Sequence, residues 1–126
     1  MNHTERLKNI WQSVYANGSE VVSMIENFFD PDYEQCINGI TMHRPEYINH
    51  VIAQKQNMII ESIDYKNIIE KEDELFAIYY PKGRNLAGLA IKAEVIAYFK
   101  FRNKRIFRIH GQVRLIDGDL SDVDMN

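Results

Sequence analysis

The sequence predicts an α+β protein in which three N-terminal helices precede an antiparallel sheet. Before Met58 the apolar residues recur at helical spacing, and from Met58 onward apolar and polar residues alternate as in strands. The longest expected strand, about 17 residues, would reach about 56 Å, whereas a domain of 126 residues is only about 36 Å across. The sheet must therefore bend, and a bent sheet can hold the helices on its concave side with a ligand pocket between the two layers.

The composition indicates one domain, residues 1–126, with an apolar core. The chain carries 15 Lys and Arg against 18 Asp and Glu, and 45% of its residues are hydrophobic. Because it lacks the basic excess of nucleic-acid-binding proteins, no nucleic-acid partner is expected. The single Cys36 can form no internal disulfide, and the polar residues 1–11 offer no apolar run of the kind expected in a signal peptide or membrane span. We therefore expect a cytoplasmic protein with no membrane partner and an acidic, frayed tail at residues 117–126.

Two helices are expected first. Asn2 or Thr4 can cap the start of the first, Gly18 can end it, and Ser19 can cap the second. Pro31 stops the second helix, because proline disfavours helical geometry in the residue before it. The apolar faces are Leu7, Ile10, Trp11, Val14 and Tyr15 in the first helix, and Val21, Val22, Ile25, Phe28 and Phe29 in the second.

A short strand at 33–37 and a loop at Asn38-Gly39 follow. Pro45 then opens a third helix through about Asn57. The remaining strands are expected at 59–71, 74–81, 86–102 and 105–116, with turns at 71–73, 81–85 and 103–104. Gly88 would lie inside the longest strand, where a glycine commonly marks a bulge or a sharp bend.

The order of these elements resembles the nuclear transport factor 2-like superfamily, which includes SnoaL-like polyketide cyclases and ketosteroid isomerases. The resemblance covers residues 4–116 and is carried by Asn17-Gly18-Ser19, the 28–33 element, Arg44-Pro45-Glu46-Tyr47, Tyr98-Phe99-Lys100-Phe101 and Lys104-Arg105-Ile106. It implies a cone-shaped fold whose curved antiparallel or mixed sheet wraps three helices. It also implies an apolar cavity with few polar groups, and a homodimer formed through the outer face of the sheet.

The catalytic residues of that superfamily are replaced in this chain. The resemblance implies that the enolate-stabilising tyrosine corresponds to Trp11, the general-base aspartate to Ile37 or Asn38, and the protonated aspartate to Ala97. Indole offers a single donor, Asn cannot act as a base, and alanine offers no polar group. We therefore assign no catalytic residue, and whether the chain is an enzyme stays open.

The last strand decides which residues face the cavity. Its apolar series would point inward and its polar series outward, and the preceding strand would follow the same alternation. The inward residues would be Val95, Ala97, Phe99, Phe107, Ile109, Gly111 and Val113, and the outward ones Glu94, Ile96, Tyr98, Lys100, Arg108, His110, Gln112 and Arg114. A slip of one residue would instead place Arg108 and His110 inside, as an anion or acid/base site. The cyclase acid would fall near Arg108, His110 or Arg114, none of which is a carboxylate.

The candidate ligand-binding residues are the aromatic and polar residues, and one aliphatic residue, expected around the cavity. They are Trp11, Tyr15, Tyr33, Asn38, His43, Tyr47, Tyr79, Phe99 and Ile109. Aromatic faces give contact area, and a Tyr hydroxyl or Trp N–H gives orientation. His43 and His50 are seven residues apart, unlike the four-residue spacing of a helical zinc pair, and no metal or cofactor is expected.

Two functions are compatible with this pattern. The first is a domain that binds a small, mostly apolar molecule, with isomerase, cyclase or hydrolase-type activity left open. The alternative is a non-enzymatic dimerisation or protein-interaction module whose cavity is filled by its own side chains. A cavity of about 300 Å³ or more with two convergent polar groups would favour the first function.

Overall fold

The computed structural model describes residues 1–118, so the predicted frayed tail lies almost wholly outside the described residues. Three helices and six strands follow one another along the chain. They are α1 His3–Val14, α2 Val21–Phe28, β1 Phe29–Ile37, β2 Ile40–His43, α3 Arg44–Asn57, β3 Met58–Lys71, β4 Glu74–Asn85, β5 Ala90–Arg102 and β6 Arg105–Asp117. Within residues 1–118, none of the helices is both long enough and apolar enough to cross a membrane.

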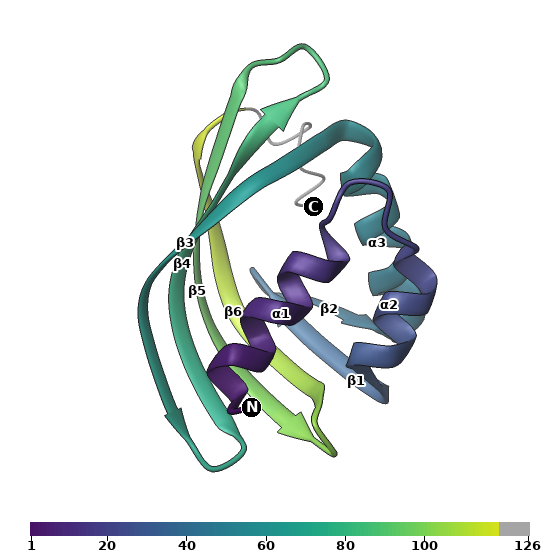
Figure 1. Cartoon of the computed structure of the whole chain (residues 1–126), viewed down its shortest axis with the longest axis vertical. Helices are drawn as coiled ribbons and strands as arrows, with labels where there is room; N and C mark the ends of the chain where they lie inside the picture. The colour runs from purple at the N-terminus through teal and green to yellow at the C-terminus, as the bar shows by residue number, and fades with distance from the viewer. Residues whose placement is uncertain (119–126) are drawn as a thin grey trace.

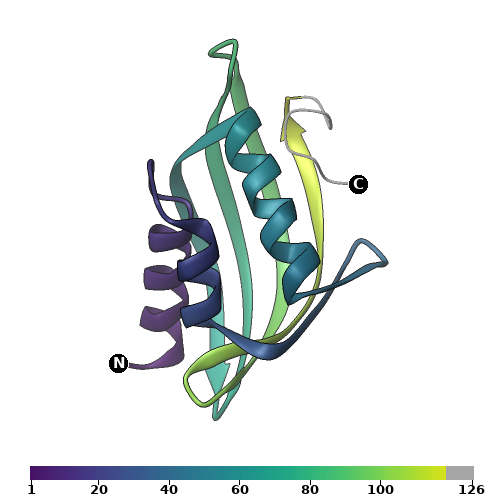
Figure 2. The same cartoon turned by 90° about the vertical axis from the view of Figure 1, so that its right-hand side faces the viewer.

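The six strands form one curved sheet in the order β2-β1-β6-β5-β4-β3. β1 pairs in parallel with β6, and the other neighbours are antiparallel. The helices lie on the concave side of the sheet, with α3 running across its middle (Figures 1 and 2). This arrangement confirms the predicted α+β class, the mixed sheet and the position of the helices.

The first helix begins as expected but ends at Val14, before the expected Gly18, and the second lacks its expected cap. The Asn2 side chain accepts a hydrogen bond from the Glu5 backbone N–H at 2.8 Å and caps α1. Ser19 does not cap α2, which begins at Val21 without a side-chain cap. The Ser19 hydroxyl donates instead to the Val14 carbonyl at 2.8 Å, because the carbonyls at the end of α1 also need partners.

The predicted turn at 81–85 is wrong. β4 continues through Asn85, and the chain turns at residues 86–89. Gly88 has φ +81° within this turn, so it supplies left-handed backbone geometry there and does not bend a strand. Irregularities in pairing accompany the curvature instead, with register shifts along β3 between Ile60 and Ser62 and between Tyr65 and Asn67.

The segment between α2 and α3 is more extended than predicted. β1 begins at Phe29, and the turn at Asn38 (φ +53°) and Gly39 (φ +80°) leads into a short strand, β2, that the sequence analysis missed. The β1–β6 register shifts between Phe29 and Glu34, so the stretch that contains Pro31 departs from regular pairing. Proline lacks the N–H that a regular ladder needs, which fits this irregular stretch.

The alternation in β5 and β6 is confirmed except near Phe107. Ile109 is buried, whereas His110 is exposed. Ile106, and not Phe107, enters the core, because the β5–β6 register shifts between Lys100 and Phe101. The Phe107 ring instead lies between the guanidinium groups of Arg102 and Arg108, at 3.9 and 3.8 Å from its centroid.

Candidate functional site

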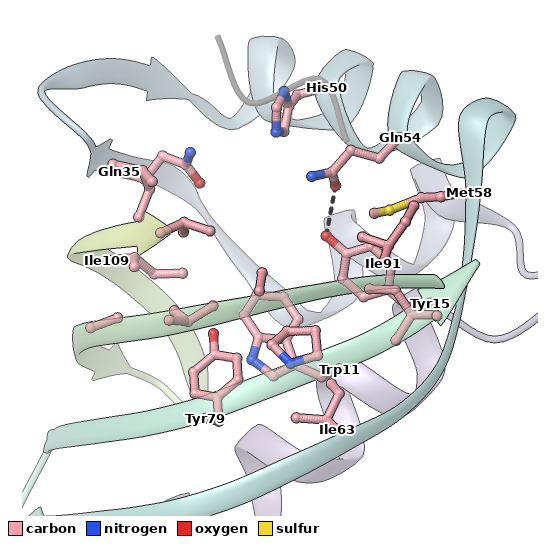
Figure 3. Close-up of a pocket in the computed structure, with 18 of the residues that line it drawn as sticks. Trp11, Tyr15, Gln35, His50, Gln54, Met58, Ile63, Tyr79, Ile91 and Ile109 are labelled. Atoms are coloured by element: carbon pink, nitrogen blue, oxygen red, sulfur yellow. Dashed lines mark hydrogen bonds between the residues drawn. The ribbon is translucent and has the colours of Figure 1, made fainter. Parts of the chain in front are cut away.

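A pocket of about 170 Å³ lies between the helices and the concave face of the sheet (Figure 3). Its wall is mostly apolar and is built by inward residues of β3, β4, β5 and β6. The strand residues include Ile63, Ile91, Val95, Ala97, Ile109 and Val113. Trp11 of α1, Tyr15 directly after this helix, and the inner face of α3 complete the wall.

Two glutamines supply amide groups to the pocket. The Tyr15 hydroxyl donates to Gln54 Oε1 at 2.8 Å, and the Tyr33 hydroxyl donates to Gln35 Oε1 at 2.7 Å. Each glutamine oxygen therefore already accepts a hydrogen bond from a tyrosine. The amide NH₂ of each side chain is the group left to serve as a donor within the pocket.

The indole nitrogen of Trp11 is buried without a hydrogen-bond partner. The Trp11 side chain is 5% exposed, and its Nε1 meets no acceptor among the described residues. The Tyr79 hydroxyl lies on the same side of the pocket (Figure 3), and its interaction with the Trp11 side chain acts to lower the pKa of Tyr79 against the larger raising effect of burial. A buried donor with no acceptor costs about 1–3 kcal/mol. This indole N–H therefore stands out among the polar groups of the site.

The tyrosines around the pocket are neutral at physiological pH. Burial raises the pKa of Tyr15 to about 12 and raises the pKa of Tyr33, Tyr47 and Tyr79 further above its ordinary value. Among the described residues that line the pocket, none is Asp or Glu. Neutral phenols, amides and an indole can bind and orient a polar atom. The described lining offers no carboxylate to remove a proton, and the imidazole of His50 is the group there that belongs to a common class of general base.

Six of the nine predicted ligand-binding residues line the pocket. They are Trp11, Tyr15, Asn38, Tyr47, Tyr79 and Ile109. Asn38 has a structural role as well, because its amide donates to the Val113 carbonyl at 3.0 Å and accepts from the Val113 N–H at 2.9 Å. These two bonds tie the β1–β2 turn to β6 at the edge of the pocket.

The structure places the other three predicted residues outside the pocket lining. Tyr33 and Phe99 are fully buried in the core behind the pocket wall. The His43 side chain is 60% exposed at the start of α3, and its Nε2 lies 3.1 Å from Glu34 Oε2. A residue that precedes a helix and pairs with an exposed carboxylate is held at the surface. The alternative site with Arg108 and His110 is also absent from the lining, and Arg108 Nη1 donates to the Asp32 carbonyl at 2.8 Å.

Sequence reasoning missed both glutamines and His50, although helical spacing held a usable signal. Gln54 and His50 lie seven and three residues after Tyr47, so all three share one face of α3. Figure 3 shows His50 and Gln54 on the pocket side of that helix. Gln35 follows Tyr33 by two residues in β1, and a buried polar residue at strand spacing gives no sign of whether it faces a core or a cavity.

No family model matches the chain. It is 21% identical to an uncharacterized protein of Schizosaccharomyces pombe (strain 972) over 111 residues, which cover 88% of this chain and 85% of that protein. Solved structures that it resembles include two described as "Putative Isomerase". One is from Bacillus subtilis, with TM-score 0.70, 15% identity and 90% of each chain covered. The other is from Rhodopseudomonas palustris, with TM-score 0.73, 10% identity, and 98% of this chain and 94% of that chain covered.

A third structure names the fold. It is a nuclear transport factor 2-like protein of unknown function from Exiguobacterium sp. 255-15, with TM-score 0.69 and 12% identity, covering 90% of this chain and 98% of that chain. At this level of identity the likeness shows the fold alone. The chain therefore has the nuclear transport factor 2-like fold that its sequence resembles.

Proposed function

We propose that this chain is a small-molecule-binding domain whose pocket takes a small, mostly apolar molecule. The observation that carries the proposal is the apolar pocket of about 170 Å³, which the chain leaves unfilled between its two layers. An apolar pocket that its own side chains do not fill loses packing contacts that a matching ligand would restore. The solved structures described as isomerases and as a SnoaL-like polyketide cyclase are consistent with a ligand in this place.

The volume restricts the size of the ligand. The pocket is smaller than the volume of about 300 Å³ that would have favoured ligand binding by size, which is the lower end for drug-sized ligands. Apolar cavities of about 150 Å³ bind benzene. The enclosed part of the ligand is therefore about one ring in size, and a four-ring steroid would extend beyond the pocket.

The lining supports binding more strongly than turnover. The polar side chains in the described lining are those of Trp11, Tyr15, Tyr47, Tyr79, Asn38, His50 and the two glutamines, with Lys82 on β4. A reaction that begins with proton abstraction needs a base within hydrogen-bond reach of the substrate, and the described lining holds the His50 imidazole but no carboxylate, Ser or Cys to act with it. We therefore propose ligand binding as the function and assign no catalytic residue.

The test is the thermal stability of the protein with single-ring apolar compounds such as ethylbenzene and toluene. A ligand present at ten times its Kd adds about 1.4 kcal/mol of stability, which corresponds to a rise in Tm of about 5 °C for a domain of this size. Ala93→Leu, which fills the pocket wall, should abolish the rise, whereas Ile96→Leu on the exposed face of the same strand should preserve it. If no single-ring compound raises the Tm, or if Ala93→Leu retains the full rise, the proposal fails.

A second candidate function is self-association through the convex face of the sheet, and we propose it as compatible with the first. Ile69, Phe76 and Ile96 are 71%, 43% and 39% exposed. Ile69 pairs with Phe76, and Ile96 pairs with the residue two positions beyond Phe76, so the three side chains share one face. Sedimentation of the native chain should give a dimer that Phe76→Glu dissociates. A native chain that sediments as a monomer at all concentrations would contradict this second function.

A further inference from the structure

We propose that the tip of the β4–β5 hairpin docks on a lipid bilayer that contains anionic lipids. Leu86 and Leu89 enter the acyl region, and the basic residues Lys82, Arg84 and Lys92 behind them face the headgroups. The inference goes beyond the proposed function, because it concerns the outer end of the sheet and not the interior of the pocket. It is carried by an exposed apolar tip that lies directly beyond a group of cations.

The tip exposes two leucines where the hairpin projects beyond the other elements. Leu86 and Leu89 are 78% and 65% exposed, and Figures 1 and 2 show the hairpin extending past the rest of the sheet. The sequence from 85 to 91, Asn-Leu-Ala-Gly-Leu-Ala-Ile, contains no charged residue. Large apolar side chains that are grouped at a projecting point are typical of a contact surface.

The backbone of the turn already has hydrogen-bond partners of its own. The Asn85 N–H donates to the Leu89 carbonyl at 3.0 Å, and the Gly88 N–H donates to the Asn85 carbonyl at 3.0 Å. The Leu89 N–H donates to Asn85 Oδ1 at 2.9 Å. Because these polar groups are paired within the turn, they keep their partners when the tip leaves water, which lowers the cost of inserting it.

The cations lie where lipid headgroups would be. Lys82 of β4 is directly opposite Lys92 of β5, and Arg84 follows Lys82 by two residues, so the three share one face of the sheet. Like charges opposite each other on a sheet are unfavourable, and an anionic headgroup between them relieves this repulsion. Long basic side chains also reach from an inserted apolar segment back to the interface.

Nearby carboxylates offset part of this positive charge. Asp64 Oδ2 lies 4.0 Å from Lys82 Nζ, and Glu61 Oε1 lies 3.3 Å from Arg84 Nε. Asp117 of β6 is opposite the third cation in the sheet register. The two ion pairs are exposed, and exposed ion pairs contribute little free energy, so headgroups can compete for the cations. The leucines therefore supply most of the affinity, and anionic lipid adds to it.

The pocket reaches the same end of the sheet. Gly83 of β4 and Ile91 of β5 line the pocket and lie within three residues of the leucines. A tip seated in the bilayer holds the pocket next to the phase in which small apolar molecules concentrate. This revises the expectation of no membrane partner, which rests on the lack of a spanning run in residues 1–11. A loop that enters only the interface needs far fewer apolar residues than a span.

The experiment measures co-sedimentation of the full chain with lipid vesicles. The native chain should bind vesicles of phosphatidylcholine and phosphatidylserine, and should bind vesicles of phosphatidylcholine alone more weakly. The double variant Leu86→Ser, Leu89→Ser should bind the mixed vesicles at least about tenfold less tightly. It should keep the native Tm, because both leucines are exposed, so a loss of binding is not a loss of fold. Val22→Ser, which removes an exposed aliphatic side chain on α2, should bind as the native chain does.

Two further measurements test the charges and the orientation. Lys92→Gln should lower binding to the mixed vesicles about fivefold and leave binding to phosphatidylcholine unchanged. In bicelles that carry a spin-labelled lipid, the amide signals of residues 86–89 should broaden, and those of residues 103–104 should not. The turn at 103–104 lies at the opposite end of the sheet (Figure 1). It is a matched reference, because Lys104 and Arg105 give it positive charge without a leucine.

Each outcome supports or overturns the inference. Binding that depends on the leucines and is stronger on the mixed vesicles supports it. The inference is overturned if the native chain binds neither vesicle, if the leucine variant binds as the native chain does, or if residues 103–104 broaden in place of 86–89. Leucine-dependent binding that is equal on both vesicles overturns the assignment of anionic lipid. A native oligomer that binds no vesicle and dissociates in the leucine variant shows that the tip joins copies of the chain, which also overturns the inference.

Discussion

Replacing Asp30 with Asn is expected to loosen the irregular start of β1 and to destabilise the whole domain. The Asp30 carboxylate is almost fully buried. It accepts hydrogen bonds from Arg102 Nε at 3.0 Å, Arg102 Nη2 at 2.7 Å and the Asp32 N–H at 2.8 Å. These bonds lie where the β1–β6 register shifts, so they fasten backbone that the regular ladder does not hold. β1 then continues to Gln35 in the pocket wall, so a looser start also affects the site.

The size of the effect follows from the bonds that an amide cannot make. Asn keeps the shape of Asp30, but its NH₂ group would face the Arg102 guanidinium, donor against donor. Hydrogen bonds to charged groups contribute about 1.5–3 kcal/mol each. Arg102 is 43% exposed, so water replaces part of what is lost, and we expect a loss of about 2 kcal/mol at pH 7. With an unfolding entropy of about 2.1 cal/mol/K per residue, the Tm should fall by about 8 °C.

The pH dependence supplies an independent check. The hydrogen bonds from Arg102 are the largest influence on the Asp30 carboxyl, and they lower its pKa in the folded protein. The unfolded value is about 3.9, so this stabilisation is complete above the unfolded pKa and is lost as the pH falls through the lowered pKa. Urea unfolding should therefore show a smaller difference between native protein and Asp30→Asn at pH 3 than at pH 7.

A matched control uses the same guanidinium. Asp32 also accepts from Arg102 Nη2, at 3.1 Å, but its side chain is 77% exposed. Asp32→Asn should therefore cost less than about 0.5 kcal/mol. The reasoning would be refuted if both variants lost the same stability at pH 7, or if the deficit of Asp30→Asn were unchanged at pH 3.

Three further substitutions test how the pocket is supported. Gly83→Ala should lower the free energy of unfolding in urea by about 2 kcal/mol or more, because a Cβ there would lie 1.8 Å from the Ile59 carbonyl oxygen. Lys55→Met should lower the free energy of unfolding by about 1–2 kcal/mol and speed amide exchange at the end of α1. Lys55 Nζ donates there to the carbonyls of Val14 and Ala16, at 3.0 and 2.8 Å. Tyr33→Phe should cost about 1–3 kcal/mol in urea unfolding, because it leaves the buried Gln35 oxygen without its donor. If a variant has the same urea midpoint, or for Lys55→Met the same amide exchange rate, as the native protein, the contribution assigned to that contact is wrong.

Much of the fold could be predicted from the sequence because its pattern is local. The helical spacing in α1 and the alternation from Met58 onward identified the helical half and the sheet half correctly. The errors lie where distant contacts decide the conformation. Extended backbone continues through Pro31 because β1 joins β6, about seventy residues away in the chain, and the Arg102 side chain fastens the irregular stretch. β4 extends to Asn85 because β3 and β5 both continue to pair with this strand beyond residue 81, with Asn85 opposite Met58 of β3.

The candidate site was predictable only in part, for a similar reason. Aromatic residues such as Trp11 and Tyr79 bury themselves in any interior, so the sequence could indicate an aromatic cavity but not which ring lies behind its wall, as Phe99 does. Whether a polar atom is satisfied depends on its neighbours in space. The tyrosine donors to the two glutamines and the missing acceptor at the indole appear only when the layers are assembled.

The parallel pairing of β1 with β6 also sets the order in which the molecule can be completed. During synthesis β1 leaves the ribosome long before residues 105–117, so its hydrogen-bonding edge must wait for the last strand. Contacts so distant in the chain also slow folding, because a long loop must close before they form. A nascent chain that stops before β6 would lack one wall of the pocket and expose an unpaired edge on both β1 and β5. A complete pocket wall, and with it the proposed ligand binding, thus becomes available only after the final strand has docked.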